Sequence, residues 1–530
     1  MVVQLPPDDE QDRHDDVAES TEETPLLSEV TATSSSHANR PRPRGRSSSI
    51  ASLASAVPKL RSSRSVIILL CIVIFVGSSA SGFQNMSMTR IFEDILCRQY
   101  YDQIRSHDEP IDERICKVDA IQSKLAYLFA IQNSIIAGVS VLAALPWGIA
   151  ADKIGRRPVF AMGLAGMSIS LLWIMVVGWF YRTLSPRLIW LSPIAYLLGG
   201  GNPVLAATIT SIAVDVVPES QRSVSFIRIH GASMVGNLIS PALASIMMSS
   251  TGPWPPIFMA LLLTVLPAFA IFLVPESLKQ KPQHESGGGT LKAHLAQSFR
   301  ELRKSANVFG SPSMILILLI TMLQLSLGQC TYQFLSQFAS KRFNIHLAAT
   351  GYIQSAYGVA FITVSFFIVP FVSSAILKPG APAFLYFDDD RRRDLFLSRS
   401  SYIASLVGTF ILGLSVSIPW FVFGLVILAL GVSGEGFLKS IATLYVTAEQ
   451  RSRLFTILGL SAIASDLWVS PALAALFSLG MRLGGVWVGL PYFGVSGLCV
   501  LMFSMALFLK LPTSSIVDEE SDSDEGLRSE

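Results

Sequence analysis

Long apolar segments constrain the fold of this chain more than any other feature of its sequence. Twelve such segments follow one another between residues 66 and 510, and none alternates apolar and polar residues as a β-strand does. A helix satisfies its own backbone hydrogen bonds, which a lipid bilayer requires. The sequence therefore predicts an all-α integral membrane protein with twelve transmembrane helices. The expected spans are 66–88, 124–146, 158–180, 188–212, 225–248, 256–274, 312–335, 351–377, 398–418, 420–444, 454–479 and 486–510.

The charged residues are concentrated at the two ends of the chain. Residues 1–65 hold 18 of the 78 charged residues and residues 511–530 hold 8, which leaves 52 for the 445 residues between them. A segment as polar as residues 1–65 cannot bury enough apolar surface to fold, so we expect a disordered tail there. Residues 511–530 form a second, acidic tail.

A polar linker, residues 275–311, divides the spans six and six. We therefore expect an N-terminal six-helix half, residues 66–274, and a C-terminal six-helix half, residues 312–510. Lysine and arginine are roughly twice as numerous in the segments that share a side with the N-terminus as in the opposite loops. By the positive-inside rule, both termini are expected to be cytoplasmic.

The N-terminal tail contains one short pattern that bears on location. Glu22, Leu26 and Leu27 resemble an acidic dileucine sorting signal, which routes membrane proteins to vacuoles or lysosomes. Two chance leucines in a tail are the alternative. A vacuolar membrane and a plasma membrane both stay open.

Several classes of protein are excluded by what the sequence lacks. The net charge of +2 does not indicate a nucleic-acid partner, and the five cysteines show no CxxC spacing that would hold a metal. The sequence also contains no HExxH, no GxSxG and no GxxxxGK[ST] pattern. We expect no cofactor, no metal and no enzyme activity.

An internal repeat relates the two halves. The sequence Ser-Pro-Ala-Leu-Ala occurs at residues 240–244 and again at residues 470–474, and Arg222 and Arg451 precede the two copies by 18 and 19 residues. Six spans separate the copies, so both halves have the same orientation in the membrane. Such a repeat places a substrate site near the midplane, between halves that move about it.

The loop between the second and third spans reads Gly148-Ile149-Ala150-Ala151-Asp152-Lys153-Ile154-Gly155-Arg156-Arg157. It resembles the signature loop of the major facilitator superfamily, Gly-x-x-x-Asp-(Arg/Lys)-x-Gly-Arg-(Arg/Lys). The resemblance implies a conformational latch on the cytoplasmic side, and a stretch after the fourth span resembles a second part of the same gate. The latch residues that the resemblance implies are Gly148, Asp152, Gly155, Arg156, Arg157, Asp215 and Arg222. Positive-inside anchoring is the alternative role for the basic residues.

The first outside loop, residues 89–123, contains Cys97 and Cys116. It resembles a subgroup of fungal facilitators and, more distantly, relatives of the proton-coupled folate transporter. Because the loop faces an oxidising or luminal compartment, the two thiols either form a disulfide or remain unpaired.

Ionisable residues inside spans are the candidates for proton coupling, because a charge in a bilayer usually lines a cavity or finds a partner. Asp466 is the leading candidate, since no cation lies within one turn of it on its helix. Glu435 and Lys439, four residues apart, form either a coupling site or a self-neutralising pair. Arg228 either lines the cavity or reaches the surface, and His230 either titrates or is a core residue. Polar amides that could line the same cavity are Gln84, Gln132, Asn133, Gln324 and Gln329.

Together these features predict a secondary transporter that moves a small organic molecule by alternating access, coupled to protons. A transporter-like nutrient sensor and a proton-independent uniporter are the alternatives. The expected partners are the small-molecule substrate, protons and the lipid bilayer, and we expect the protein to work as a monomer.

Overall fold

The structure is a computed structural model, and it describes residues 63–101, 112–217, 222–274, 311–332, 334–376, 390–432, 434–446 and 451–512. All of these belong to one of the two units of the chain, Ala56–Glu530. Glu22, Leu26 and Leu27, which carry the possible sorting signal, lie outside the described residues.

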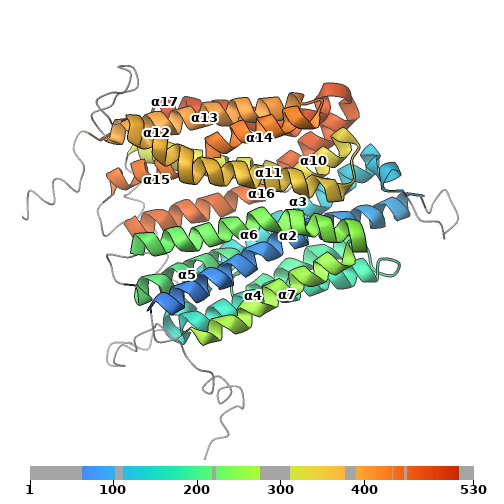
Figure 1. The fold of residues 1–530 in the computed structure, drawn as a ribbon, viewed down its shortest axis with the longest axis horizontal. Helices are drawn as coiled ribbons and strands as arrows, with labels where there is room; N and C mark the ends of the chain where they lie inside the picture. Colours follow the sequence, from blue (N-terminus) through green and yellow to red (C-terminus); the bar gives the residue numbers. More distant parts are fainter. Residues whose placement is uncertain are drawn as a thin grey trace, which may run out of the picture. The chain divides into compact units, whose positions relative to one another are not determined.

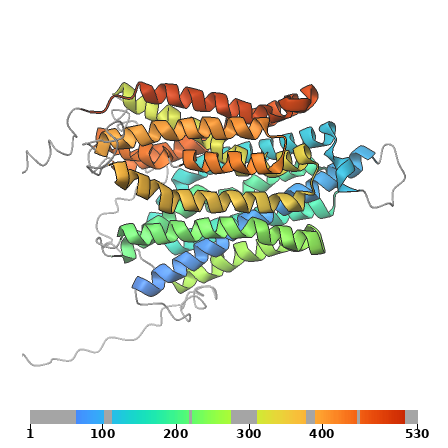
Figure 2. The ribbon, with the colours of Figure 1, turned by 45° about the horizontal axis from the view of Figure 1, so that its top comes forward.

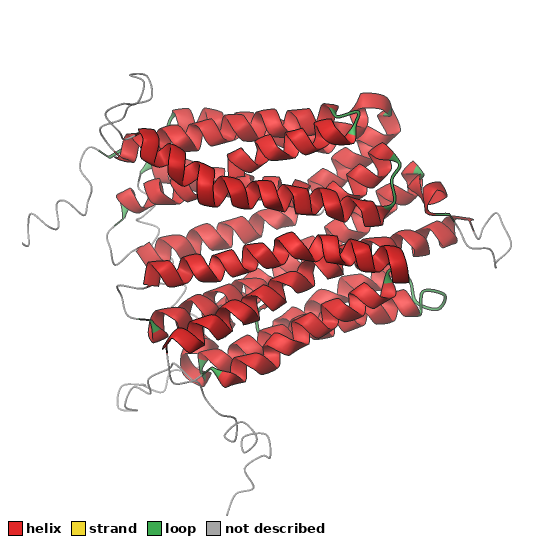
Figure 3. Cartoon of the chain, in the orientation of Figure 1, coloured by secondary structure: helices red, strands yellow, loops and turns green. Residues whose placement is uncertain are grey.

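The described residues form helices joined by short turns, and none of them is in a β-strand (Figures 1 and 3). The N-terminal helices are α2 (Ser63–Tyr101), η1 (Glu113–Lys117), α3 (Asp119–Ile154), α4 (Arg156–Trp179), η2 (Pro186–Leu197), α5 (Gly201–Val216), α6 (Arg222–Thr251), α7 (Trp254–Ala270) and η4 (Ile271–Leu273). The C-terminal helices are α9 (Pro312–Tyr332), α10 (Phe334–Phe343), α11 (Leu347–Thr363), η6 (Val364–Ile368), α12 (Val369–Ile376), α13 (Asp390–Leu414), α14 (Ile418–Val432), α15 (Gly434–Ala442), η7 (Thr443–Tyr445), α16 (Arg451–Leu483), η9 (Gly485–Gly489) and α17 (Leu490–Leu507).

Eleven helical segments in the described ranges are long and apolar enough to cross a membrane, and a shorter apolar helix, Pro312–Gly328, falls in the expected seventh span. The prediction of a multi-pass helical membrane protein is confirmed. Large apolar side chains such as Leu142, Phe367 and Phe371 are each more than two-thirds exposed, as expected for helices surrounded by lipid.

The helix ends gather at two levels (Figure 2). We call one the terminal end, because the first and last described helices begin and end there. At this end Ser63 bonds the carbonyl of Val216, and Ser313 bonds the carbonyl of Lys510. The opposite end carries η1 and the cysteine pair, and we call it the disulfide end.

The first span extends farther than its predicted end at residue 88. Helix α2 continues three more turns to Tyr101. Two ion pairs stabilise this extension: Arg90 lies 3.1 Å from Glu93, and Arg98 lies 2.9 Å from Asp94. Pairs three and four residues apart meet on one helix face, so charges that looked like loop residues continue the helix instead.

The fourth span is broken near its middle. A 3-10 segment, η2, ends at Leu197, and the α-helix resumes at Gly201, the last of three glycines with positive φ: Gly199 at 88°, Gly200 at 79° and Gly201 at 68°. Only glycine adopts this conformation without steric cost. The structure describes α14 and α15 on either side of residue 433, and together they make one apolar helical segment, Ile418–Tyr445, in the expected tenth span.

The repeated Ser-Pro-Ala-Leu-Ala sequences lie inside α6 and α16, with Pro241 and Pro471 in helix interiors. Glycines from two neighbours approach the first copy. A Cβ atom at Gly82 would lie 3.0 Å from the backbone nitrogen of Pro241, and one at Gly351 would lie 2.5 Å from its carbonyl oxygen. Helices α2 and α11 thus meet α6 at the repeated motif, which joins N-terminal and C-terminal helices.

Candidate functional site

The basic residues of the signature loop make contacts at the terminal end. Arg156 donates to the carbonyl oxygen of Ser211 at 2.6 Å and forms an ion pair with Asp215 on α5. Arg157 donates to the carbonyl oxygen of Val274. These contacts fasten α4 to α5 and to the end of η4, all within the N-terminal helices.

The glycines of the loop differ in their surroundings. Gly155 has φ 112°, and it separates α3 from α4, so a side chain there would be strained. A Cβ atom at Gly148 would meet nothing within 4 Å among the described residues. Asp152 lies in α3 and Arg222 begins α6, and their side chains lie outside the described part of the chain.

Three predicted charge-site residues come together from both sets of helices. His230 on α6 lies within electrostatic range of Glu435 and Lys439 on α15. Glu435 and Lys439 form an ion pair whose side chains are 48% and 41% exposed. Arg228, two residues before His230, is exposed and within electrostatic range of Cys71 on α2. Their exposure shows that Glu435 and Lys439 are open to solvent or ligand rather than packed in a core.

Asp466, the leading sequence candidate, occupies a separate position. It lies near the middle of α16 and is half-buried. The hydroxyl of Ser134 on α3 donates to the backbone carbonyl oxygens of Asp466 at 3.5 Å and of Leu467 at 3.2 Å. Here α3 and α16 cross, one from each set of helices.

The predicted amides differ in how far they are satisfied. Gln132 is buried and donates to Ser192 on η2 at 3.2 Å, but its side-chain oxygen has no partner among the described residues. Gln324 is 7% exposed, and neither atom of its amide has a partner there. Gln84 and Asn133 are half-buried, and the side chain of Gln329 lies outside the description.

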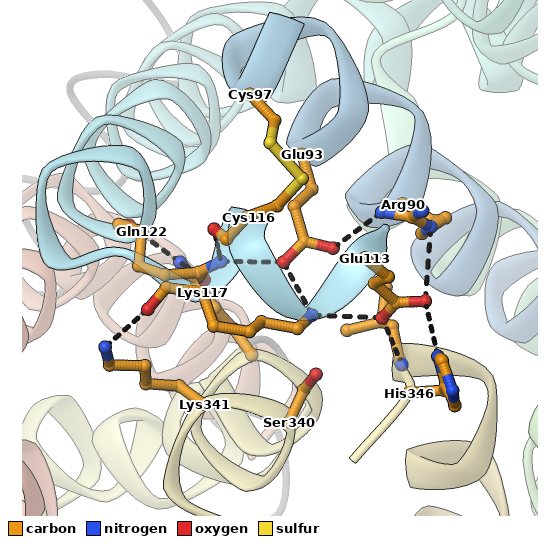
Figure 4. A network of polar contacts seen from close by, with 12 residues as sticks. Arg90, Glu93, Cys97, Glu113, Cys116, Lys117, Gln122, Ser340, Lys341 and His346 are labelled. Atoms are coloured by element: carbon orange, nitrogen blue, oxygen red, sulfur yellow. Dashed lines mark hydrogen bonds and ion pairs between the residues drawn. A yellow bond between two sulfur atoms is a disulfide. The ribbon is translucent and has the colours of Figure 1, made fainter. Parts of the chain in front are cut away.

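A buried charge network at the disulfide end was not anticipated from the sequence. Lys117 lies 2.7 Å from Glu93 and 3.0 Å from Glu113. Arg90 completes the group, 3.1 Å from Glu93 and 3.4 Å from Glu113. Figure 4 shows these side chains converging from α2 and η1. The charges of the two cations and the two carboxylates cancel, and buried charges are tolerated when they are paired in this way.

Gln122 on α3 extends this network. Its amide nitrogen donates to Glu93 at 2.6 Å and to the carbonyl oxygen of Cys116 at 3.1 Å. Cys116 and Cys97 form a disulfide with an S–S distance of 2.05 Å, which holds η1 against the last turns of α2. Of the two alternatives left by the sequence, the structure has the bonded pair.

The same network reaches the C-terminal helices. Glu113 accepts a hydrogen bond from the backbone N–H of Leu347 at 2.6 Å and lies 3.2 Å from the ring of His346 (Figure 4). Burial raises the pKa of Glu113, but Lys117, Arg90 and the Leu347 N–H outweigh it and leave the pKa below its ordinary value. Glu113 is therefore a stable anion that bridges η1 to the start of α11.

Two further contacts join the sets at this end. Lys341 on α10 lies 2.6 Å from Asp119 on α3, and Gln337 donates to the carbonyl oxygen of Gln122 at 2.8 Å. The signal that was available in the sequence is the spacing of Arg90 and Glu93, and of Glu113 and Lys117, at three and four residues. Their meeting across helices was not available from spacing.

The geometry described so far joins two sets of long apolar helices through contacts at mid-helix and at the disulfide end. The model of the Major Facilitator Superfamily matches residues 125–470, more than half of the chain. The chain belongs to the major facilitator superfamily.

Curated members of the superfamily from fungi resemble the chain along most of its length. The MFS efflux pump atnC of Emericella nidulans is 28% identical over 467 residues, which cover 83% of this chain and 88% of that protein. The efflux pump ustT of Aspergillus flavus is 27% identical over 414 residues, 74% of this chain and 78% of that protein.

Solved structures of the superfamily share the fold. The D-xylose-proton symporter has a TM-score of 0.60 at 14% identity, covering 85% of this chain and 99% of that one. The human organic anion transporter MFSD10 has a TM-score of 0.54 at 18% identity, covering 83% and 99%. These homologues are transporters, not enzymes, and the same holds for this facilitator.

Proposed function

We propose that this facilitator exports a small organic molecule by alternating access, driven by protons. The observation that carries the proposal is where the two sets of helices are joined. The hydrogen bonds and ion pairs described above between N-terminal and C-terminal helices run from the Ser134–Leu467 contact at mid-helix to the Lys341–Asp119 pair at the disulfide end. This arrangement supports a state closed at the disulfide end.

The proposed sidedness follows from the cysteine pair and the basic loops. A disulfide is typical of an extracytoplasmic compartment, and lysine and arginine gather at the terminal end. In the proposed cycle, substrate enters from the cytoplasm in the present state. The network around Glu113 then separates, while Asp152 of the signature loop and Arg222 at the start of α6 close the terminal end.

We propose Glu435 as the residue that carries the proton. It shares its surroundings with His230 from the other set of helices, so movement of the two sets changes the charges around it. His230 is on α6 and changes its distance from Glu435 when the two sets move, whereas Lys439 is on the same helix as Glu435 and moves with it. Asp466, at the α3–α16 crossing, is the second candidate.

The direction and the substrate class follow from the relatives and from one buried amide. The fungal relatives are called efflux pumps, which supports export. The unpartnered amide of Gln324 offers a donor and an acceptor to a polar group of the substrate. A small organic molecule with both apolar and polar parts fits this environment.

The proposal is tested with the purified chain reconstituted in liposomes that contain a pH-sensitive dye. Rhodamine and fluorescein derivatives serve as cationic and anionic probes, and both probe flux and proton flux are recorded under an imposed pH gradient. We expect the gradient to drive flux of at least one probe. We expect Glu435→Gln to abolish proton-driven flux yet keep probe-induced thermal stabilisation.

The control is Asp94→Asn, which removes a carboxylate from a half-buried pair at the disulfide end. If Asp466→Asn, and not Glu435→Gln, uncouples the protein, the assignment to Glu435 is wrong. Flux that ignores pH in every variant indicates a uniporter. Thermal stabilisation without any flux indicates a sensor and overturns the proposed function.

A further inference from the structure

A cavity of about 880 Å³ at the disulfide end lies apart from the proposed coupling site. Its wall combines the last turns of α2, the first turns of α3, the start of η2 and the last turns of α16. The residues of the proposed coupling site, His230, Glu435 and Asp466, do not line it.

The wall of this cavity carries an excess of positive charge. Lys124 on α3, Arg187 on η2 and Arg482 on α16 line it, and all three are exposed. Within the described wall, Asp119 is the one carboxylate, and it is paired with Lys341 at 2.6 Å. Three cations from three elements therefore face one space without a carboxylate to neutralise them in that wall.

Most of the rest of the wall is apolar or aromatic, and Gln99, Ser123, Ser185 and Ser478 add neutral polar groups. Trp190 donates from its ring nitrogen to the carbonyl oxygen of Leu128 at 3.0 Å, which fixes the indole between η2 and α3. Tyr127 is 39% exposed, and Ile131 lies one turn farther from the helix end. Tryptophan and tyrosine with lysine and arginine are typical of the level where a bilayer meets water.

We propose that this cavity binds the anionic head group, a phosphate or carboxylate, of a membrane amphiphile. The guanidinium groups of Arg187 and Arg482 hold the head group through paired hydrogen bonds, and Lys124 adds a point charge. The apolar chain lies beside Leu128 and Ile131.

The position of Arg482 gives this site a consequence for the whole molecule. Arg482 belongs to the C-terminal helices, whereas Lys124 and Arg187 belong to the N-terminal helices. A bound head group therefore bridges the two sets at the end that is closed here, and it stabilises this state. The inference does not depend on the direction of transport, on proton coupling or on the substrate.

The experiment uses the purified full chain in detergent, with dioctanoyl phosphatidate and dioctanoyl phosphatidylcholine as probes. Affinity is measured from the rise in melting temperature with lipid concentration. We expect the phosphatidate to bind more tightly by about tenfold or more, and Arg187→Gln and Arg482→Gln each to weaken it by about tenfold. Arg182→Gln is the matched control, an exposed arginine at the same end but outside the cavity wall.

Each other outcome overturns part of the proposal. Equal affinity for the two lipids, or an equal loss in Arg182→Gln, reduces these cations to general anchors at the bilayer surface. Glycerol 3-phosphate binding as tightly as phosphatidate makes this a site for free anions instead of amphiphiles. Lys124→Gln, which changes a cation on α3, repeats the test if either arginine variant fails to fold.

Discussion

The ammonium group of Lys117 lies 2.7 Å from Oε1 of Glu93, although their side chains expose only 7% and 1% of their surface. The pair lies where η1 is bonded to α2 by the disulfide. Its position means that η1 is held to α2 by charge as well as by a covalent bond. Glu113 then carries the same network on to α11.

Removal of one partner of this pair is expected to destabilise the protein strongly. Glu93→Gln leaves Lys117 buried with one less carboxylate, and we expect a loss of about 3 kcal/mol in the free energy of unfolding. Denaturant-induced unfolding in detergent measures it. The double variant Glu93→Gln with Lys117→Met should lose less than the sum of the single variants. Additive losses would contradict the direct coupling of the two residues.

The disulfide is expected to stabilise the disulfide end by limiting the unfolded chain. Cys97 and Cys116 are 19 residues apart, and a loop of this length predicts a loss of about 3 kcal/mol in Cys97→Ser with Cys116→Ser. The melting temperature with and without a reductant provides the measurement. Cys71→Ser, which changes an unbonded cysteine, is the control and should leave the effect of the reductant unchanged.

The stability of the disulfide end is expected to depend on pH through Glu113. The pKa of Glu113 is lower in the folded protein than its ordinary value of 4.5. Its contribution to the free energy of unfolding is therefore fully present above pH 4.5 and is lost as the pH falls through the pKa of the folded protein. We expect the melting temperature to fall in this acidic range in the wild type and less steeply in Glu113→Gln. An equally steep fall in both proteins would assign the acid effect to other groups.

The close packing of α4 on the broken fourth span is expected to make Gly166 sensitive to any side chain. A Cβ atom there would lie 2.4 Å from the carbonyl oxygen of Leu198 and 2.6 Å from that of Ala195. Gly166→Ala should therefore cost about 1–3 kcal/mol in stability.

Gly77→Ala is the matched control for this variant, because a Cβ atom at Gly77 meets nothing within 4 Å among the described residues. It should be neutral or stabilising, since alanine favours a helix over glycine. Unfolding of both variants in detergent is compared with the wild type. Equal stability of the two variants would show that the backbone of the fourth span moves to make room for the added methyl group.

Much of this protein was determined by the sequence alone. Runs of apolar residues predict helices in lipid whatever their neighbours, because the bilayer allows little else, and the signature loop at Gly148–Arg157 led to the family. The repeat at Ser240-Pro241 and Ser470-Pro471 predicted two related sets of helices. These signals are local or periodic, so they can be recognised in the sequence without a structure.

The tertiary structure decided which charges meet. Glu93 and Lys117 are 24 residues apart and separated by a loop, and His230 and Glu435 belong to different sets of helices. Spacing along one helix reveals only partners within a turn or so, such as Glu435 and Lys439. Contacts between helices depend on how these pack and cross, and this packing placed the buried network at the disulfide end and three cations around one cavity.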